Sequence, residues 1–121
     1  MKINNWYGWI IEESLDSQEV FQEFETVKMK SEEADWNEHI VEIPEDKLNQ
    51  VVTWLEKHLK PAWYGHLVGG DEIIVVYQRK SFKLKKGESF SEAAEYGRRL
   101  GIIEDQLPGN GLFELARNSG Y

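Results

Sequence analysis

The pattern of apolar and polar positions along the chain predicts six β-strands and three helices. The clearest stretch lies within residues 61–84, where apolar runs at 62–68 and 73–77 flank a Gly-Gly-Asp-Glu connection typical of a β-hairpin. A second tight link leads to a further strand at 82–85. We therefore predict a three-stranded meander in the middle of one sheet, with the rest of the chain packed on or beside it.

Three more strands are predicted before this meander. Residues 5–13 are apolar on both faces, which indicates a strand that is central or covered on both sides. Residues 24–30 alternate as in a half-exposed strand, and residues 36–43 form a third strand with mixed faces. A short helix at 18–24 separates the first of these strands from the second.

Two longer helices are predicted. The first begins at Pro44, which suits the first helical position, and an apolar stripe at i, i+3, i+4, i+7 and i+11 starts at Leu48. The second follows Ser89, which forms a capping-box pattern with Glu92, and ends at Gly101 in a Schellman-type stop. Small residues on one face of this second helix favour a close approach to a neighbouring element.

The order of elements predicts an α+β layered domain with an antiparallel sheet of about five to six strands and two main helices. The first six elements fit a ferredoxin-like βαββαβ core. We expect residues 1–107 to form this domain. Residues 108–121, after a Pro-Gly-Asn-Gly break, form either a short docked helix or a mobile tail.

Two segments that begin 57 residues apart share one pattern of aromatic, glycine and apolar positions. Glycine inside a strand often marks a close approach by another backbone or by an aromatic ring. The two segments are either simply two central strands of one sheet, or strands that pair directly with aromatic rings over their glycines. They are Trp6-Tyr7-Gly8-Trp9-Ile10-Ile11 and Trp63-Tyr64-Gly65-His66-Leu67-Val68.

Composition excludes several classes of protein. The chain has no cysteine, so disulfides, thiolate zinc sites and cysteine nucleophiles are excluded. No apolar run approaches the roughly 18 residues that span a bilayer, and the start lacks a signal-peptide pattern. We expect a soluble cytoplasmic protein that does not associate with membranes.

The net charge of −8 is unevenly distributed. Residues 12–46 contain thirteen acidic residues and two lysines, whereas residues 47–121 contain eleven basic and nine acidic residues. The acidic segment would repel phosphate, so nucleic-acid binding is disfavoured. This segment is either a solubilising surface or a docking face for a protein with a basic surface.

His66 is the main candidate for chemistry. No phosphate-loop, zinc-protease, nucleophile-elbow or calcium-loop motif is present, so no metal or cofactor is predicted. His66 shares a strand face with Tyr64 and lies beside the hairpin turn that offers Asp71 and Glu72. A histidine near carboxylates can bind a metal or perform acid–base chemistry, whereas a hydrogen-bonded strand histidine is the common alternative.

A second candidate is the basic segment 79–86, in which five of eight residues are Lys or Arg. Its two apolar side chains point one way and two of its lysines the other, as in an edge strand whose outer lysines discourage aggregation. The alternative is a small site for an anion or RNA that includes Lys80, with Phe82 available to stack on a base.

Four groups of landmarks along residues 1–107 carry a family resemblance. They are Trp6-Tyr7-Gly8 with Ile11-Glu12-Glu13-Ser14-Leu15, then Ile43-Pro44-Glu45-Asp46-Lys47-Leu48, then Trp63-Tyr64-Gly65-His66 with Lys80-Ser81-Phe82, and last Glu95-Tyr96-Gly97 with Leu100-Gly101-Ile102. In these landmarks the chain resembles a family of small prokaryotic α+β proteins with no established activity. The resemblance implies the fold and a cytoplasmic location, and it implies no mechanism.

Two classes of function remain open. The first is a non-catalytic binding or protein-interaction domain that acts through its acidic surface and exposed aromatic side chains such as Trp36 and Trp54. The second is a small enzyme, or a protein that binds a small ligand or metal, with a site around His66. A cleft with polar groups converging on His66 would favour the second class, and a flat acidic face would favour the first.

Overall fold

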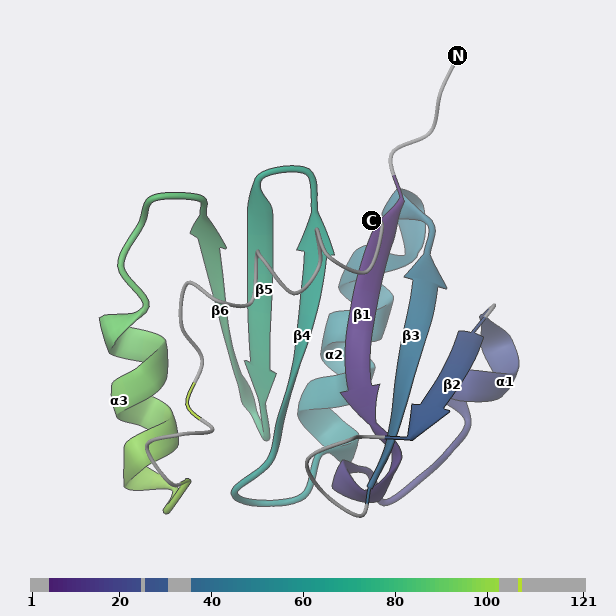
Figure 1. The fold of residues 1–121 in the computed structure, drawn as a ribbon, viewed down its shortest axis with the longest axis horizontal. Coiled ribbons are helices and arrows are strands. Elements are labelled where there is room, and N and C mark those ends of the chain that lie inside the picture. The colour runs from purple at the N-terminus through teal and green to yellow at the C-terminus, as the bar shows by residue number, and fades with distance from the viewer. Residues whose placement is uncertain (1–4, 25, 31–35, 103–106, 108–121) are drawn as a thin grey trace.

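The computed structural model describes residues 5–24, 26–30, 36–102 and 107 of the chain. Its six strands form one antiparallel sheet in the order β2-β3-β1-β4-β5-β6 (Figure 1). The predicted α+β class and strand number are therefore confirmed. The strands are β1 Trp6–Ile11, β2 Thr26–Lys30, β3 Asn37–Ile43, β4 Tyr64–Gly69, β5 Glu72–Tyr77 and β6 Lys80–Lys85. The helices are α1 Val20–Glu23, α2 Leu48–His58 and α3 Ser91–Arg99, with short 3-10 turns η1 Glu12–Ser14 and η2 Glu45–Lys47.

The elements from β1 to β4 form the ferredoxin-like core that their order predicts. Helix α1 connects β1 to β2, and helix α2 connects β3 to β4. In each case a third strand lies between the two connected strands, because the sheet order is β2-β3-β1-β4. This is the split β-α-β arrangement of ferredoxin-like domains. Strands β5 and β6 extend the sheet beyond β4.

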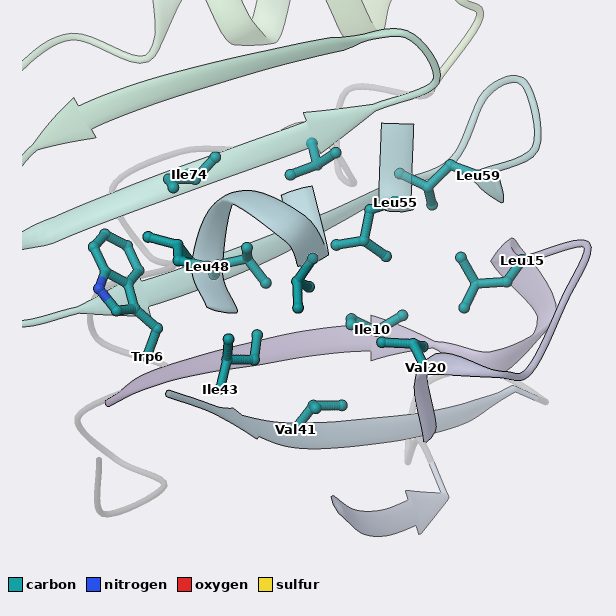
Figure 2. Close-up of a cluster of buried hydrophobic side chains, with 13 residues drawn as sticks. Trp6, Ile10, Leu15, Val20, Val41, Ile43, Leu48, Leu55, Leu59 and Ile74 are labelled. Atoms are coloured by element: carbon teal, nitrogen blue, oxygen red, sulfur yellow. The ribbon is translucent and has the colours of Figure 1, made fainter. Parts of the chain in front are cut away.

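Helices α1 and α2 cover one face of the sheet. Figure 2 shows Leu48 and Leu55 of α2 among the strand side chains Ile10, Ile43 and Ile74. The apolar stripe predicted for this helix is thus its buried side, and each fully buried side chain of this kind contributes about 1.5–3 kcal/mol to the free energy of folding.

Helix α2 begins later than the sequence predicted. Pro44 has an extended ψ of 142° and accepts a bond at 2.9 Å from the amide of Lys47, so it precedes the turn η2 and is not itself helical. The regular α-helix starts at Leu48, after this 3-10 turn. Proline therefore fixes the entry to the helix from outside it.

Helix α3 packs on the opposite face, beside β6 in Figure 1. The hydroxyl of Tyr77 donates to the carbonyl of Ala93 at 2.7 Å, and a Cβ on Gly97 would come within 2.7 Å of that hydroxyl oxygen. The predicted close approach is confirmed. The helix ends in the predicted Schellman motif, with Ile102 N–H bonded to Gly97 O and Gly101 N–H to Arg98 O, both at 3.1 Å.

The two similar segments do pair, as β1 and β4, in an antiparallel register that places Gly8 opposite Leu67. The idea that aromatic rings cover the shared glycines is wrong in detail. Gly8 is covered by the Leu67 side chain, whose Cδ2 would lie 2.7 Å from an added Cβ, and Gly65 faces the backbone of Trp9. The ring of Trp6 instead lies against Gly69, at the end of β4.

The meander β4-β5-β6 forms one side of the sheet and not its middle, which corrects the sequence prediction. Strand β1 adds to the free side of β4, so β1 becomes central and β6 becomes an edge strand. The edge character predicted for residues 79–86 is confirmed: Lys83 and Lys85 are exposed, whereas Phe82 and Leu84 pack partly buried beneath α3. The alternatives for residues 108–121 lie outside the described residues.

Candidate functional site

A pocket of about 200 Å³ opens on the face of the sheet that carries α3, at the end where β1 finishes and β4 begins. Ligand pockets for drug-sized molecules usually measure about 300–1,000 Å³, so an occupant of this one has to be small. Half of the described lining residues have aromatic rings, and most of the others are aliphatic. The described lining residues are Trp9, Ile10, Ile11, Trp36, Glu38, Ala62, Trp63, Tyr64, His66 and Ile102.

The register of β3, β1 and β4 explains which of their side chains form the floor of the pocket. Trp9 of β1 lies opposite His66 of β4, and Ile11 of β1 lies opposite Glu38 of β3. These residues share one face because side chains alternate along a strand. Tyr64, the first residue of β4, lies on that face two positions before His66, next to the row of Ile11 and Glu38. Polar groups from β3 and β4 thus flank the apolar side chains of β1.

His66 is buried but has an unused polar atom. Its residue exposure is 6%, and its ring stacks on Trp9 with centroids 5.5 Å apart and planes 5° from parallel. Its Nε2 atom is buried and has no hydrogen-bond partner. Burial lowers the pKa of His66 from 6.5 to about 4, because removal from water penalises the charged form. The imidazole is therefore neutral near pH 7 and offers one donor and one acceptor nitrogen.

Tyr64 is the second polar group from β4. Its ring lies beside that of Tyr77, its partner on β5, with centroids 5.6 Å apart. Burial raises the pKa of Tyr64 to about 12, so its hydroxyl stays protonated at any physiological pH. Tyr64 can therefore donate a hydrogen bond, but it does not serve as a base here.

The outer wall is formed by two tryptophans from segments far apart in the chain. Trp36, just before β3, meets Trp63, just before β4, edge to face with ring centroids 5.6 Å apart. The indole N–H of Trp36 points to Glu38 Oε1 at 3.4 Å, which keeps this carboxylate beside the aromatic wall. Trp36 was predicted to be an exposed aromatic, and the structure instead places it half-buried at the pocket.

Ala62 at the pocket margin has an unusual backbone conformation. Its φ is +67°, in the left-handed region that costs a non-glycine residue roughly 1–2 kcal/mol. The residue is exposed, so packing of its own side chain does not compensate for that cost. Strained positions of this kind concentrate at ligand-binding sites, where the surrounding structure holds them in place.

The six residues that the sequence singled out do not form one site. Tyr64 and His66 line the pocket together. Asp71 lies in the β4–β5 turn, and Glu72 lies opposite Gly69, where its carboxylate pairs with Lys83 at 3.6 Å. The expected grouping of His66 with these two carboxylates is therefore not found, because they lie at the far end of the hairpin.

Lys80 and Phe82 line a separate groove between β6 and α3. The Lys80 ammonium lies 5.4 Å from the centroid of the Phe82 ring. The same groove contains Arg98 and Arg99, but both lie within ion-pair distance of Glu95, at 2.6 Å and 3.7 Å. Its charge is therefore mixed, which is unlike the continuous basic track of a single-stranded RNA site.

Besides the aliphatic lining, sequence reasoning missed the three tryptophans and the one carboxylate among the described lining residues of the pocket, which are Trp9, Trp36, Trp63 and Glu38. The pattern shared by residues 6–11 and 63–68 did point to Trp9 and Trp63, since each lies in one of the two segments. Nothing in the sequence linked Glu38 to His66, because β1 separates their strands. Among the residues that the structure describes, no group of three or more His, Asp or Glu side chains could hold a metal ion.

Comparisons of the chain with protein-family models, with curated proteins and with solved structures give no match. The resemblance to a family of small prokaryotic proteins therefore stays an expectation. Within the described part of the chain, no helix is long and apolar enough to cross a membrane. Docking of a basic partner on residues 12–46 also stays a prediction, and residues 25 and 31–35 of that segment lie outside the structural description.

Proposed function

We propose that the protein is a binding domain for a small organic molecule, which occupies the pocket between β3, β1 and β4. One observation carries the proposal: His66 lines this pocket, and its buried Nε2 atom has no hydrogen-bond partner. An unsatisfied buried polar group costs about 1–3 kcal/mol of folding free energy. A ligand that bonds to this nitrogen would offset that cost on binding.

The aromatic lining supports the same proposal. Trp9, Trp36, Trp63 and Tyr64 supply flat apolar surfaces around a small number of polar groups, the composition expected of a small-molecule site. These tryptophans come from three separate parts of the chain, so the fold brings them together. Binding without chemical conversion is the proposal, since the neutral His66 and the protonated Tyr64 need only donate and accept hydrogen bonds.

A fragment screen monitored by the indole N–H and histidine ring signals in NMR spectra tests this function. Ligands of the pocket should shift the signals of Trp9, Trp36 and His66 and leave those of Trp54 and His58 unchanged. Trp54 and His58 form a tilted ring pair on helix α2, with centroids 4.3 Å apart, and so provide an internal control.

Two variants sharpen the screen. His66→Gln should lower the affinity for a fragment that binds in the pocket, whereas His58→Gln should not. A ligand at a hundred times its Kd should stabilise the native protein by about 2.7 kcal/mol. Trp36→Leu provides a second pocket variant at a half-buried position if His66→Gln fails to fold. A screen without any fragment that shifts the pocket signals contradicts the proposed function, as does binding that survives both pocket variants.

A further inference from the structure

We propose that the pocket selects an organic ammonium ion that carries at least one N–H group, held between the carboxylate of Glu38 and the imidazole of His66. This inference rests on the proposed function and specifies the class of ligand. It follows from three properties of the lining: the identity of its aromatic rings, the sign of its charge and the spacing of its polar groups.

The aromatic rings favour a cation. Trp9, Trp36, Trp63 and Tyr64 all line the pocket, and the faces of Trp and Tyr rings carry the negative side of the aromatic quadrupole. The attraction of a cation to such rings grows when water is excluded, and Trp is the best ring for it. A site lined by three indoles and one phenol therefore favours positive charge wherever a ring face is open to the pocket, which leaves out the face of Trp9 that the stacked His66 ring covers.

The charged groups point the same way. Among the described lining residues, Glu38 is the only Asp, Glu, Lys or Arg. His66 adds no positive charge near neutral pH because burial keeps it uncharged. An anionic ligand would meet a carboxylate and aromatic faces with no described cation to balance it. An ammonium ion would meet a carboxylate and rings that both attract it.

The spacing of polar groups defines the form of the cation. Glu38 on β3 is opposite Ile11 and His66 on β4 is opposite Trp9, so their backbones lie about 10 Å apart across the sheet and roughly 7 Å apart along it. Side chains from both strands rise from the same face, with Trp9 and Ile11 of β1 between them, so a ligand that reaches both polar groups has to lie over these two side chains. Neutral His66 accepts a hydrogen bond at its unprotonated nitrogen. The unpartnered Nε2 can take this role only if the ligand supplies a hydrogen-bond donor, and in an organic ammonium ion that donor is an N–H group, which a quaternary ammonium lacks.

The proposal therefore requires a defined tautomer, with the His66 proton on Nδ1 and Nε2 left as the acceptor in the complex. Imidazole ¹⁵N shifts distinguish the two tautomers directly. A complex in which Nε2 carries the proton while the ligand donates none would overturn the assignment of His66 as the acceptor for the ammonium.

Calorimetry with three matched probes tests the choice of charge. The probes are 2-phenylethylammonium, 2-phenylethanol and phenylacetate, which share one ring and differ in the charge of a short tail. The ammonium should bind about tenfold or more tighter than the alcohol, and phenylacetate should bind least. Trimethylation of the ammonium should weaken it, because the N–H groups are lost.

Variants on β3 test whether the Glu38 carboxylate selects the positive charge of the ligand. Glu38→Gln should reduce the affinity for the ammonium probe about tenfold and leave the alcohol unchanged. Glu42→Gln is the matched control, since Glu42 lies on the same strand and face, four residues away, but does not line the pocket and bonds to Asn5 Nδ2 at 2.7 Å. Melting curves of both variants establish that they fold.

The outcomes separate this inference from the function on which it rests. If the alcohol or the carboxylate binds as tightly as the ammonium, the pocket is a ligand site but selection of ammonium is wrong. If no probe binds while the fragment screen finds other pocket ligands, ammonium selection is again wrong and the binding function stands. Equal losses in Glu38→Gln and Glu42→Gln would refute a specific role for Glu38.

Discussion

Protonation of His66 should destabilise the folded protein, because the imidazole is buried without a partner and a charge there is costly. Its pKa is lowered from 6.5 to about 4 by burial. Between these two pKa values His66 is protonated in the unfolded chain but not in the folded chain. Stability should therefore fall as the pH drops from about 6.5 toward 4, and this group should have no effect above that window.

The size of the effect follows from the two pKa values. Each pKa unit corresponds to about 1.4 kcal/mol, so the full penalty is about 3 kcal/mol once the pH is below 4. At pH 5 the penalty is about 2 kcal/mol, because the unfolded histidine is then almost fully protonated and the folded one is not. A loss of that size is a large share of the 5–15 kcal/mol by which native proteins are stable.

Urea unfolding of the wild type and of His66→Gln at pH 7, 6 and 5 measures this penalty. The difference between the two proteins removes the contribution of groups that titrate alike in both. The wild type should lose about 2 kcal/mol more than the variant between pH 7 and pH 5. A difference that stays constant over this range, or a His66 ring that titrates near pH 6.5 in NMR spectra, would refute the reasoning.

Two further variants test the packing on either face of the sheet. Gly69→Ala should lower the free energy of unfolding by about 1–3 kcal/mol, because its Cβ would overlap the Trp6 ring. In a double-mutant cycle, the variant with both Gly69→Ala and Trp6→Leu should lose less stability than the sum of the two single variants. Tyr77→Phe should cost about 1 kcal/mol in chemical unfolding, through loss of the 2.7 Å bond to the Ala93 carbonyl, and a change below about 0.3 kcal/mol would contradict that role.

The parts of the fold that could be predicted from the sequence depend on local chemistry or on a pattern of period two or 3.6. Gly101 and Ile102 predicted the end of α3 correctly, because a Schellman motif is formed by residues within about one turn of the chain. The shared pattern of residues 6–11 and 63–68 indicated two central strands, with direct pairing as one of two alternatives, and β1 and β4 do pair. Which neighbour each strand takes in the rest of the sheet is a long-range choice, so the meander was wrongly placed in the middle.

The pocket was only half predictable for the same reason. Tyr64 and His66 were identified because they lie two residues apart on one strand. Glu38 could be linked to them only through the order β3-β1-β4, which no local pattern specifies. The carboxylates Asp71 and Glu72 were proposed from their closeness in sequence, but the hairpin carries them about three residues away along the strand, away from the imidazole.

The central position of β1 has a consequence for the order in which the sheet is completed. β1 is synthesised first, yet its partners are β3, which ends at residue 43, and β4, which ends at residue 69. Strands β4, β5 and β6, by contrast, are joined by tight turns and close small loops, which cost less chain entropy. We expect amides of β5 to gain protection from pulsed hydrogen exchange before those of β1. The strand that the finished sheet surrounds on both sides is then the last to acquire both of its neighbours, and two partial sheets, β2-β3 and β4-β5-β6, have open edges until it does.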